Sequence, residues 1–165
     1  MDNPQELFPA VDEEGRVIGC VRRSQAHDGS KVLHPVVHLH VFNKNGALFL
    51  QHRPEWKDIQ PGKWDTATGG HVDYLENVEN ALRREVREEL GITDFIPEFL
   101  GKYVFEGKRE RELVYVYKTT YDGVISPNEE ELQGGRFFTP EEIRDRMGKE
   151  FFTPNFEEEY QRFFG

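Results

Sequence analysis

The chain has 165 residues and a formal net charge of −10, with 13 Phe, 6 Tyr and 2 Trp available to build a core. That length suits one domain with a packed interior and is short for two. The negative charge argues against general binding to nucleic acid or to anionic membranes, which requires basic surfaces. No run approaches the ~18–20 apolar residues of a membrane span, and the N-terminus lacks the features of a signal peptide. Cys20 is the only cysteine, so no intrachain disulfide is expected, and a cytoplasmic location is predicted.

The N-terminal third is predicted to consist mainly of strands. Residues 7–12 and 17–21 read as two strands around a turn, which gives an N-terminal hairpin over 7–21. Residues 36–42 form the next strand, and an Asn- and Gly-containing turn leads into its partner at 47–51.

A glutamate-rich helix is expected after a glycine turn. Residues 64–68 read as a short strand that leads into the glycine pair 69–70. Asn77 is a candidate N-cap, residues 81–90 contain good helix formers, and Gly91 suits the position just past a helix end.

The C-terminal half is predicted to add strands and two helices. Residues 95–105 and 112–120 look like paired strands, and 136–138 like a short one. Helices are expected within 139–164, because Thr-Pro pairs combine an N-cap with proline at the first helical position. Strands interspersed with helices predict an α+β fold, an α/β/α sandwich in which helices flank a mixed sheet. No linker divides the chain, so a single domain over 1–165 is expected.

A helical wheel of the glutamate-rich segment shows where its carboxylates lie relative to its apolar residues. At roughly 100° per residue, one apolar stripe is formed by Val78, Leu82, Val86 and Leu90. Glu85, Glu88 and Glu89 share a neighbourhood, and Glu85 and Glu89 fall at the edge of the stripe rather than opposite it. A solvated charge run would face away from the stripe, so that interpretation is disfavoured. Clustered carboxylates are costly without a cation, and their oxygens suit Mg²⁺ or Mn²⁺.

The same stretch has a defined spacing. Gly70 is followed after five residues by Glu76 and, after seven more, by Arg84-Glu85-Val86-Arg87-Glu88-Glu89-Leu90-Gly91-Ile92. This window, residues 70–92, resembles the Nudix box at every position that defines that family. The resemblance implies the Nudix fold and hydrolysis of a diphosphate linkage by metal-activated water.

Residues 11–89 are also similar to the branch of that family that contains type 1 isopentenyl diphosphate isomerases and related hydrolases. The similarity rests on residues 41–43, 46–51 and 61–64 and on the spacing of two early histidines. In the isomerases, histidines and glutamates hold a metal. The resemblance implies a second metal site at the matching positions, which are His27, His34, His71, Glu110 and Glu112.

Two features favour hydrolysis over isomerisation. The isomerases use a cysteine just before the Gly-His turn to move a proton at carbon, and that position here is Gly69. They also keep a degenerate box, whereas Glu85, Glu88 and Glu89 are all present here. Isomerase-like activity is therefore a disfavoured alternative, and a non-catalytic Nudix binding module is another.

By resemblance, the box residues have separate roles. Glu85 and Glu89 are the main metal ligands, Glu88 is a further ligand or a base, and the Gly70 carbonyl adds a ligand. The pair Glu76 and Arg84 is expected to support the helix against the preceding loop.

The general base is left open between two sets of glutamates. Glu112 and Glu110 are the first candidates. The second set, Glu129 to Glu131, reads more readily as a solvated acidic loop.

Four further residues have two interpretations each. Arg53 and Lys57 match positions that hold diphosphate in the isomerases, with ordinary surface charge as the alternative. His38 and His40 share a strand face by their period of two, and either line a substrate pocket or cover a sheet edge.

These features together predict a Mg²⁺- or Mn²⁺-dependent enzyme that acts on a nucleotide or a small organic diphosphate. The expected partner is that small molecule, not a nucleic acid polymer or a membrane. The sequence does not predict the oligomeric state, and a homodimer is named only because dimers are common among homo-oligomers.

Overall fold

The computed structural model describes residues 3–56, 60–129 and 133–165. The chain divides into two compact units. The first unit comprises Met1–His38, Gly69–Glu85 and Phe99–Tyr117, and the second comprises Leu39–Thr68, Val86–Glu98 and Lys118–Gly165. The single-domain boundary stays a prediction.

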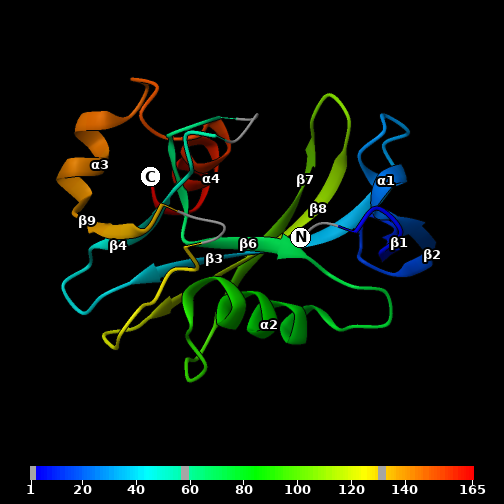
Figure 1. Ribbon diagram of the computed structural model, residues 1–165, viewed down its shortest axis with the longest axis horizontal. Coiled ribbons are helices and arrows are strands. Elements are labelled where there is room, and N and C mark those ends of the chain that lie inside the picture. The colour runs from blue at the N-terminus through cyan, green and yellow to red at the C-terminus, as the bar shows by residue number, and fades with distance from the viewer. Residues whose placement is uncertain (1–2, 57–59, 130–132) are drawn as a thin grey trace. The chain divides into compact units, whose positions relative to one another are not determined.

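The described residues contain nine strands and four helices (Figure 1). The strands are β1 (Leu7–Val11), β2 (Val17–Arg22), β3 (Leu33–Phe42), β4 (Leu48–His52), β5 (Trp64–Thr66), β6 (Thr68–His71), β7 (Glu98–Glu106), β8 (Arg111–Thr120) and β9 (Gly135–Phe138). The helices are α1 (Arg23–Ala26), α2 (Val78–Leu90), α3 (Pro140–Arg146) and α4 (Pro154–Phe164). Seven strands form one sheet with the order β5-β4-β3-β8-β7, in which β6 pairs with β3 and β9 with β4. The expected α+β class, a sheet flanked by helices, is confirmed.

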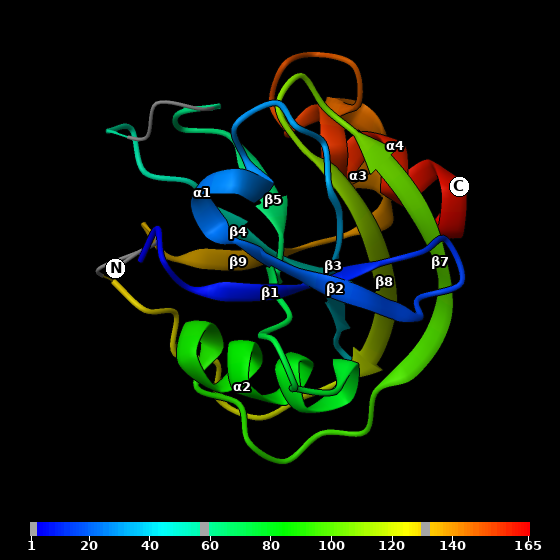
Figure 2. The same cartoon turned by 90° about the vertical axis from the view of Figure 1, so that its right-hand side faces the viewer.

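The first unit begins with the expected hairpin, whose strands β1 and β2 run side by side in Figure 2. They pair antiparallel, with Phe8 opposite Val21. Asp12 organises the turn, because its Oδ1 accepts the backbone N–H groups of Glu14 and Arg16 at 3.0 and 2.9 Å. Phe8 is fully buried in a small cluster with Val21 and Ala26, which attaches α1 to the hairpin.

Helix α2 begins and ends where its sequence predicts. The Asn77 Oδ1 accepts the backbone N–H of Asn80 at 2.7 Å, which caps the first turn. Gly91 has φ +69, the left-handed conformation that commonly ends a helix at glycine. The stripe residues Leu82, Val86 and Leu90 are fully buried, so the predicted apolar face is the packed face.

The second unit has its own aromatic core. The buried members of this core are Leu48, Leu50, Phe138, Ile143, Phe152 and Phe156. Helices α3 and α4 start as expected, because the hydroxyl oxygens of Thr139 and Thr153 accept the N–H groups of Glu142 and Phe156. Each helix thereby begins just after a core residue, Phe138 for α3 and Phe152 for α4.

The region before α2 differs from its prediction. One strand was expected over 64–68, followed by a glycine turn, but β5 ends at Thr66 and β6 runs from Thr68 to His71. The chain changes its partner here, since β5 pairs with β4 and β6 with β3. The two glycines therefore lie inside a strand. Strand β3 also starts earlier than predicted, at Leu33, and so includes His34.

Candidate functional site

Four side chains converge within the first unit. His27, His34, His71 and Glu112 each offer a ligand atom, and these atoms all lie within 4.8 Å of one another. They come from the end of α1, from β3, from the end of β6 and from the start of β8. Four of the five residues proposed for the second metal site therefore meet, although they are distant in the chain.

The imidazole nitrogens of this cluster are oriented toward a common ligand. Nδ1 of His34 lies 2.9 Å from the Val32 carbonyl oxygen, and Nδ1 of His27 lies 3.1 Å from that of Arg23. When Nδ1 donates these bonds, Nε2 is left as an acceptor. The Nε2 atoms of His34 and His71 are buried without a hydrogen-bond partner among the described residues. They lie 3.8 and 3.9 Å from Oε2 of Glu112, an arrangement that suits a shared cation.

Burial sets the charge of the cluster. It lowers the pKa of His34, and it lowers that of His71 well below the usual range, so both rings stay neutral. Burial also raises the pKa of Glu112 to about 7, assisted by the negative charge of Glu110. Neutral imidazoles beside a carboxylate that is costly to ionise fit a divalent cation. Their nitrogen-rich set suits Mn²⁺ or Zn²⁺ better than Mg²⁺, which prefers oxygen.

Glu110 does not join the group of four. Its carboxylate folds against the turn between β7 and β8, where a Cβ on Gly107 would lie 2.7 Å from Glu110 Oε1. The charge of Glu110 still acts on Glu112 and His34, but its oxygens lie outside the 4.8 Å set.

Of the three box carboxylates on α2, Glu85 and Glu89 lie at the edge of the buried face, as the wheel predicts, but Glu88 does not join them. The Glu85 side chain is 16% exposed and Glu89 is 8% exposed, whereas Glu88 is on the exposed side. The three do not form a second group within 4.8 Å in the part of the chain that is described. One reason is that Glu85 is drawn to Arg84, whose Nη1 lies 2.8 Å from Glu85 Oε1.

Arg84 connects α2 to the loop and strand before it. Its guanidinium pairs bidentately with Glu76, with Nε–Oε2 and Nη2–Oε1 distances of 2.9 Å, as the spacing predicts. Nη2 also donates to the His71 carbonyl oxygen at 3.1 Å. Hydrogen bonds with Glu76 raise the pKa of Arg84, so the cation is permanent. It ties Glu85 to the backbone of a cluster histidine.

Gly70 lies against the Glu85 side chain. A Cβ at position 70 would be 2.5 Å from both Cγ and Oε2 of Glu85, so only glycine leaves that carboxylate its place. Within the first unit, the Gly70–Glu85 contact therefore adjoins the His–Glu cluster, because Gly70 precedes His71 in β6.

Three charged side chains near the cluster could not be identified from the sequence. Arg23 pairs with Glu6 at 3.1 Å, and Arg84 lies 3.5 Å from Asp73. Burial, and then a hydrogen bond with Glu6, raise the pKa of Asp73 to about 6. No periodicity or motif identifies Glu6, Arg23 and Asp73, since the fold alone brings them together.

Of the two proposed diphosphate-binding residues, Arg53 lies in the second unit. Arg53 donates from Nε to the Gln60 carbonyl oxygen at 3.3 Å, and its Nη1 lies 3.7 Å from Asp65 Oδ2. Lys57 lies outside the described residues, as do Glu130 and Glu131 of the acidic loop. Binding of diphosphate by Arg53 and Lys57 stays a prediction.

The two strand histidines have different environments. His40 is fully buried, and its Nε2 lies 2.6 Å from Oε2 of the buried Glu159. His38 is half-buried, and a Cβ on Gly69 would lie 2.9 Å from its Cδ2. The absent side chain at Gly69 thus leaves room for the His38 ring.

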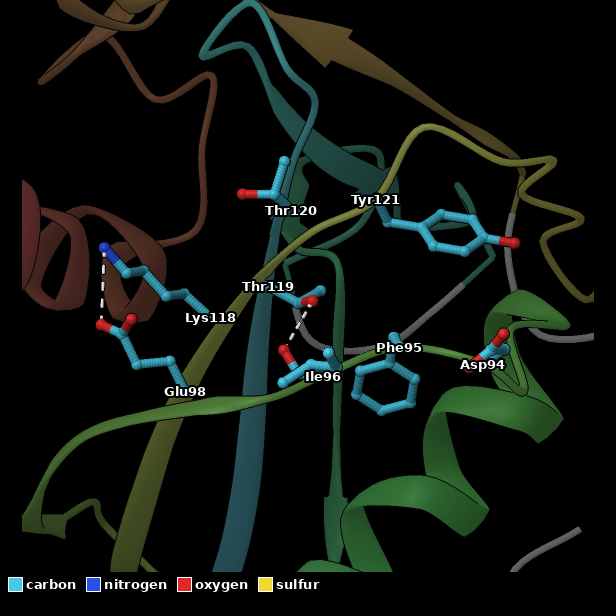
Figure 3. A pocket seen from close by; sticks show the side chains of 8 residues that line it. All are labelled: Asp94, Phe95, Ile96, Glu98, Lys118, Thr119, Thr120 and Tyr121. Atoms are coloured by element: carbon cyan, nitrogen blue, oxygen red, sulfur yellow. Dashed lines mark hydrogen bonds and ion pairs between the residues drawn. The ribbon is translucent and has the colours of Figure 1, made fainter.

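A separate cavity of about 450 Å³ lies in the second unit between the start of β7 and the end of β8 (Figure 3). Thr119 donates its hydroxyl to the Ile96 carbonyl oxygen at 2.9 Å, and Lys118 lies 3.7 Å from Glu98. Its lysine is thus already next to a carboxylate, and the lining contains no histidine. This cavity does not resemble a metal or diphosphate site.

Comparison with known proteins identifies the family. The NUDIX domain model matches residues 32–158. The chain belongs to the Nudix family. This assignment agrees with the Nudix box on α2 and with the fold.

Individual Nudix relatives cover most of the chain. An uncharacterized Nudix hydrolase of Streptomyces coelicolor is 31% identical, over 94% of this chain and 86% of the relative. A protein named isopentenyl-diphosphate Delta-isomerase 1, from Photorhabdus laumondii, is 28% identical over 91% and 90%. The crystal structure of DR0079 from Deinococcus radiodurans has a TM-score of 0.82 and 25% identity, over 97% of this chain and all of that one. These relatives support a Nudix hydrolase related to the isomerase branch.

No helix among the described residues is both long enough and apolar enough to cross a membrane.

Proposed function

We propose that this Nudix protein is a divalent-metal-dependent hydrolase that cleaves a diphosphate linkage in a nucleotide or a small organic diphosphate. The observation that carries the proposal is the packing of Glu85 against Gly70 with Arg84 bound to Glu85 and Glu76. The contact with Gly70 and the ion pair with Arg84 hold the Glu85 carboxylate in one place, which a metal ligand requires and a purely structural helix does not. The proposal includes a small-molecule partner and a cytoplasmic location, and leaves a homodimer as a prediction.

Two sets of residues would hold metal ions. Glu85 and Glu89, with Glu88 and the Gly70 carbonyl, would provide an oxygen site for Mg²⁺ or Mn²⁺. His27, His34, His71 and Glu112 would provide a nitrogen-rich site. Bound metal supplies polarisation of phosphoryl oxygens and a lower pKa of water.

The residues of the chain perform the remaining tasks. Arg84 fixes the carboxylate of Glu85 through a 2.8 Å ion pair and holds the glycine strand by its bond to the His71 carbonyl oxygen. Glu112, whose pKa burial raises to about 7, is suited to accept a proton near neutral pH when it is not a ligand. The partial burial of Glu85 and Glu89 strengthens their attraction to a cation.

The test is a substrate screen with matched variants. Nucleoside diphosphates, nucleotide sugars, dinucleotides and prenyl diphosphates are incubated with Mg²⁺ or Mn²⁺, and products are followed by phosphate release and mass shift. Glu85→Gln and Glu89→Gln are expected to lower turnover by orders of magnitude while the melting temperature changes little. Glu79→Gln is the control, because Glu79 lies on the same helix and forms an exposed ion pair with Arg83. Wild-type rates in both box variants would refute the assignment of the site.

An isomerase activity is the second candidate, favoured by the His–Glu cluster and by the Photorhabdus relative. Gly69 disfavours it, because a glycine has no group to move a proton at carbon. Solvent deuterium incorporation into isopentenyl diphosphate, followed by NMR, separates the two reactions. Incorporation at a catalytic rate would replace the hydrolase proposal, and its absence at high protein concentration would end the isomerase alternative.

A further inference from the structure

The N-terminal hairpin contributes a ring to the His–Glu cluster. Phe8 on β1 is fully buried, and its ring lies 4.5 Å from that of His71, centroid to centroid, with only 2° between the planes. It also lies 5.8 Å from the His34 ring at 13°. Phe8, His34 and His71 therefore present three nearly parallel rings, with His27 edge-on to both of the other imidazoles.

The three histidines differ in what orients them. The rings of His27 and His34 are each held by a bond from Nδ1 to a backbone carbonyl oxygen. The Nε2 atom of His71 is buried without a hydrogen-bond partner among the described residues. Metal-binding histidines commonly use their second nitrogen to fix the plane of the ring. For His71, contact with the flat face of Phe8 is the feature that can define that plane.

Phe8 itself is held firmly. The Leu7 carbonyl oxygen accepts the Tyr74 N–H at 2.9 Å, which joins β1 to the segment just after His71. The Arg23 guanidinium carbon lies 5.0 Å from the centre of the Phe8 ring, and its Nη2 lies 3.1 Å from Glu6 Oε2. The backbone bond at Leu7 and the guanidinium of Arg23 thus help to keep the Phe8 ring where it stacks on His71.

We propose that Phe8 is a positioning residue that sets the ring planes of His71 and His34, so that the hairpin is part of the cluster's construction. This inference rests on the proposed metal site. It predicts that a side chain of similar size without a flat face, as in Phe8→Leu, lets the His71 ring rotate and weakens cation binding. Outer contacts of metal ligands are worth about 10- to 100-fold in affinity, and about tenfold is expected here.

The experiment uses Co²⁺ as the probe, with titration calorimetry for affinity and visible absorption for ligand geometry. Phe8→Leu is expected to bind Co²⁺ about tenfold more weakly and to change the absorption spectrum. Val21→Ala is the matched control, because Val21 faces Phe8 in the same buried cluster without contributing a ring. The control is expected to lose stability but to keep the wild-type spectrum and affinity.

Two further measurements separate the possible failures. His34→Ala must weaken Co²⁺ binding; if it does not, the cluster is no metal site and the role of Phe8 falls with it. If His34→Ala weakens binding but folded Phe8→Leu behaves as wild type, the role of Phe8 alone is refuted.

If Phe8→Leu does not fold, NMR of the wild-type imidazoles decides the question, and His71→Gln serves to assign the His71 signals. A strong ring-current shift and one orientation of His71 are expected, and exchange between orientations would overturn the inference.

Discussion

Gly70 leaves the space that the Glu85 carboxylate occupies, since a Cβ at position 70 would lie 2.5 Å from Glu85 Oε2. The first glycine and the first glutamate of the Arg-Glu run, which the box spacing separates in sequence, are thus in direct contact in the fold. The contact gives a physical reason for glycine at this position that does not depend on a turn, because Gly70 lies inside β6.

Gly70→Ala should therefore displace Glu85 and lower hydrolysis by at least about tenfold, because an added methyl group would require a flexible carboxylate to move. The fold should survive, with a small change in melting temperature. Gly19→Ala is the control, since a Cβ there meets only the Ala10 Cβ at 3.9 Å. Equal activity of both alanine variants would show that Glu85 does not need its observed position.

Removing one member of the buried pair of His40 and Glu159 should strongly destabilise the protein. Removing one member of a buried pair leaves the other without its partner and costs about 3–5 kcal/mol. Glu159→Ala is expected in that range, and Glu159→Gln should cost less because an amide oxygen can still accept a hydrogen bond. Denaturant unfolding measures both.

Glu158 provides the neighbouring comparison. Its side chain is 62% exposed and pairs with Arg162 at 3.4 Å, so Glu158→Ala should change stability by less than about 1 kcal/mol. Similar losses for positions 158 and 159 would contradict the importance of burial.

Leu75 is expected to be a site where a substitution stabilises the protein. It has φ +72 and is 88% exposed, so it is strained without packing in return. Leu75→Gly should gain about 0.5–1 kcal/mol, the relief of strain being partly offset by the greater freedom of glycine when unfolded. Leu75→Ala keeps the strain and should change little. A glycine variant less stable than wild type would mean that Leu75 makes a favourable contact.

Stability should depend on pH through Glu112. Its folded pKa of about 7 lies above its ordinary value of 4.5, so folding favours the protonated form. The associated stability is present below about pH 4.5 and is lost as the pH rises through 7, by roughly 3 kcal/mol at most. In EDTA, the stability of Glu112→Gln relative to the wild type should therefore increase as the pH rises from 5 to 8.

Divalent metal should instead make the wild type more stable than Glu112→Gln. Binding needs a deprotonated Glu112 and neutral His34 and His71, and burial, which lowers the pKa of both histidines, favours their neutral form. At pH 8 with Mn²⁺ the wild type should melt above Glu112→Gln. Melting curves of the wild type and of Glu112→Gln are compared at pH 5 and at pH 8, in EDTA and in Mn²⁺. An unchanged order on adding Mn²⁺ would argue against Glu112 as a ligand.

The sequence by itself determined the features that depend on local periodicity and spacing. The buried stripe of α2, its cap at Asn77 and the edge position of Glu85 and Glu89 follow from 3.6 residues per turn. The box spacing identified the family and paired Arg84 with Glu76, because these residues lie within one loop and one helix.

Only the tertiary structure decided which distant side chains meet. Strand pairing set the place of Glu112 beside three histidines and turned Glu110 away, which no local pattern encodes. It also separated His38 from His40, which share a strand face but have different neighbours. Phe8 gave no signal in the sequence, since its stacking on His71 depends on where a hairpin docks. Such contacts join segments far apart in the chain and arise when whole elements pack.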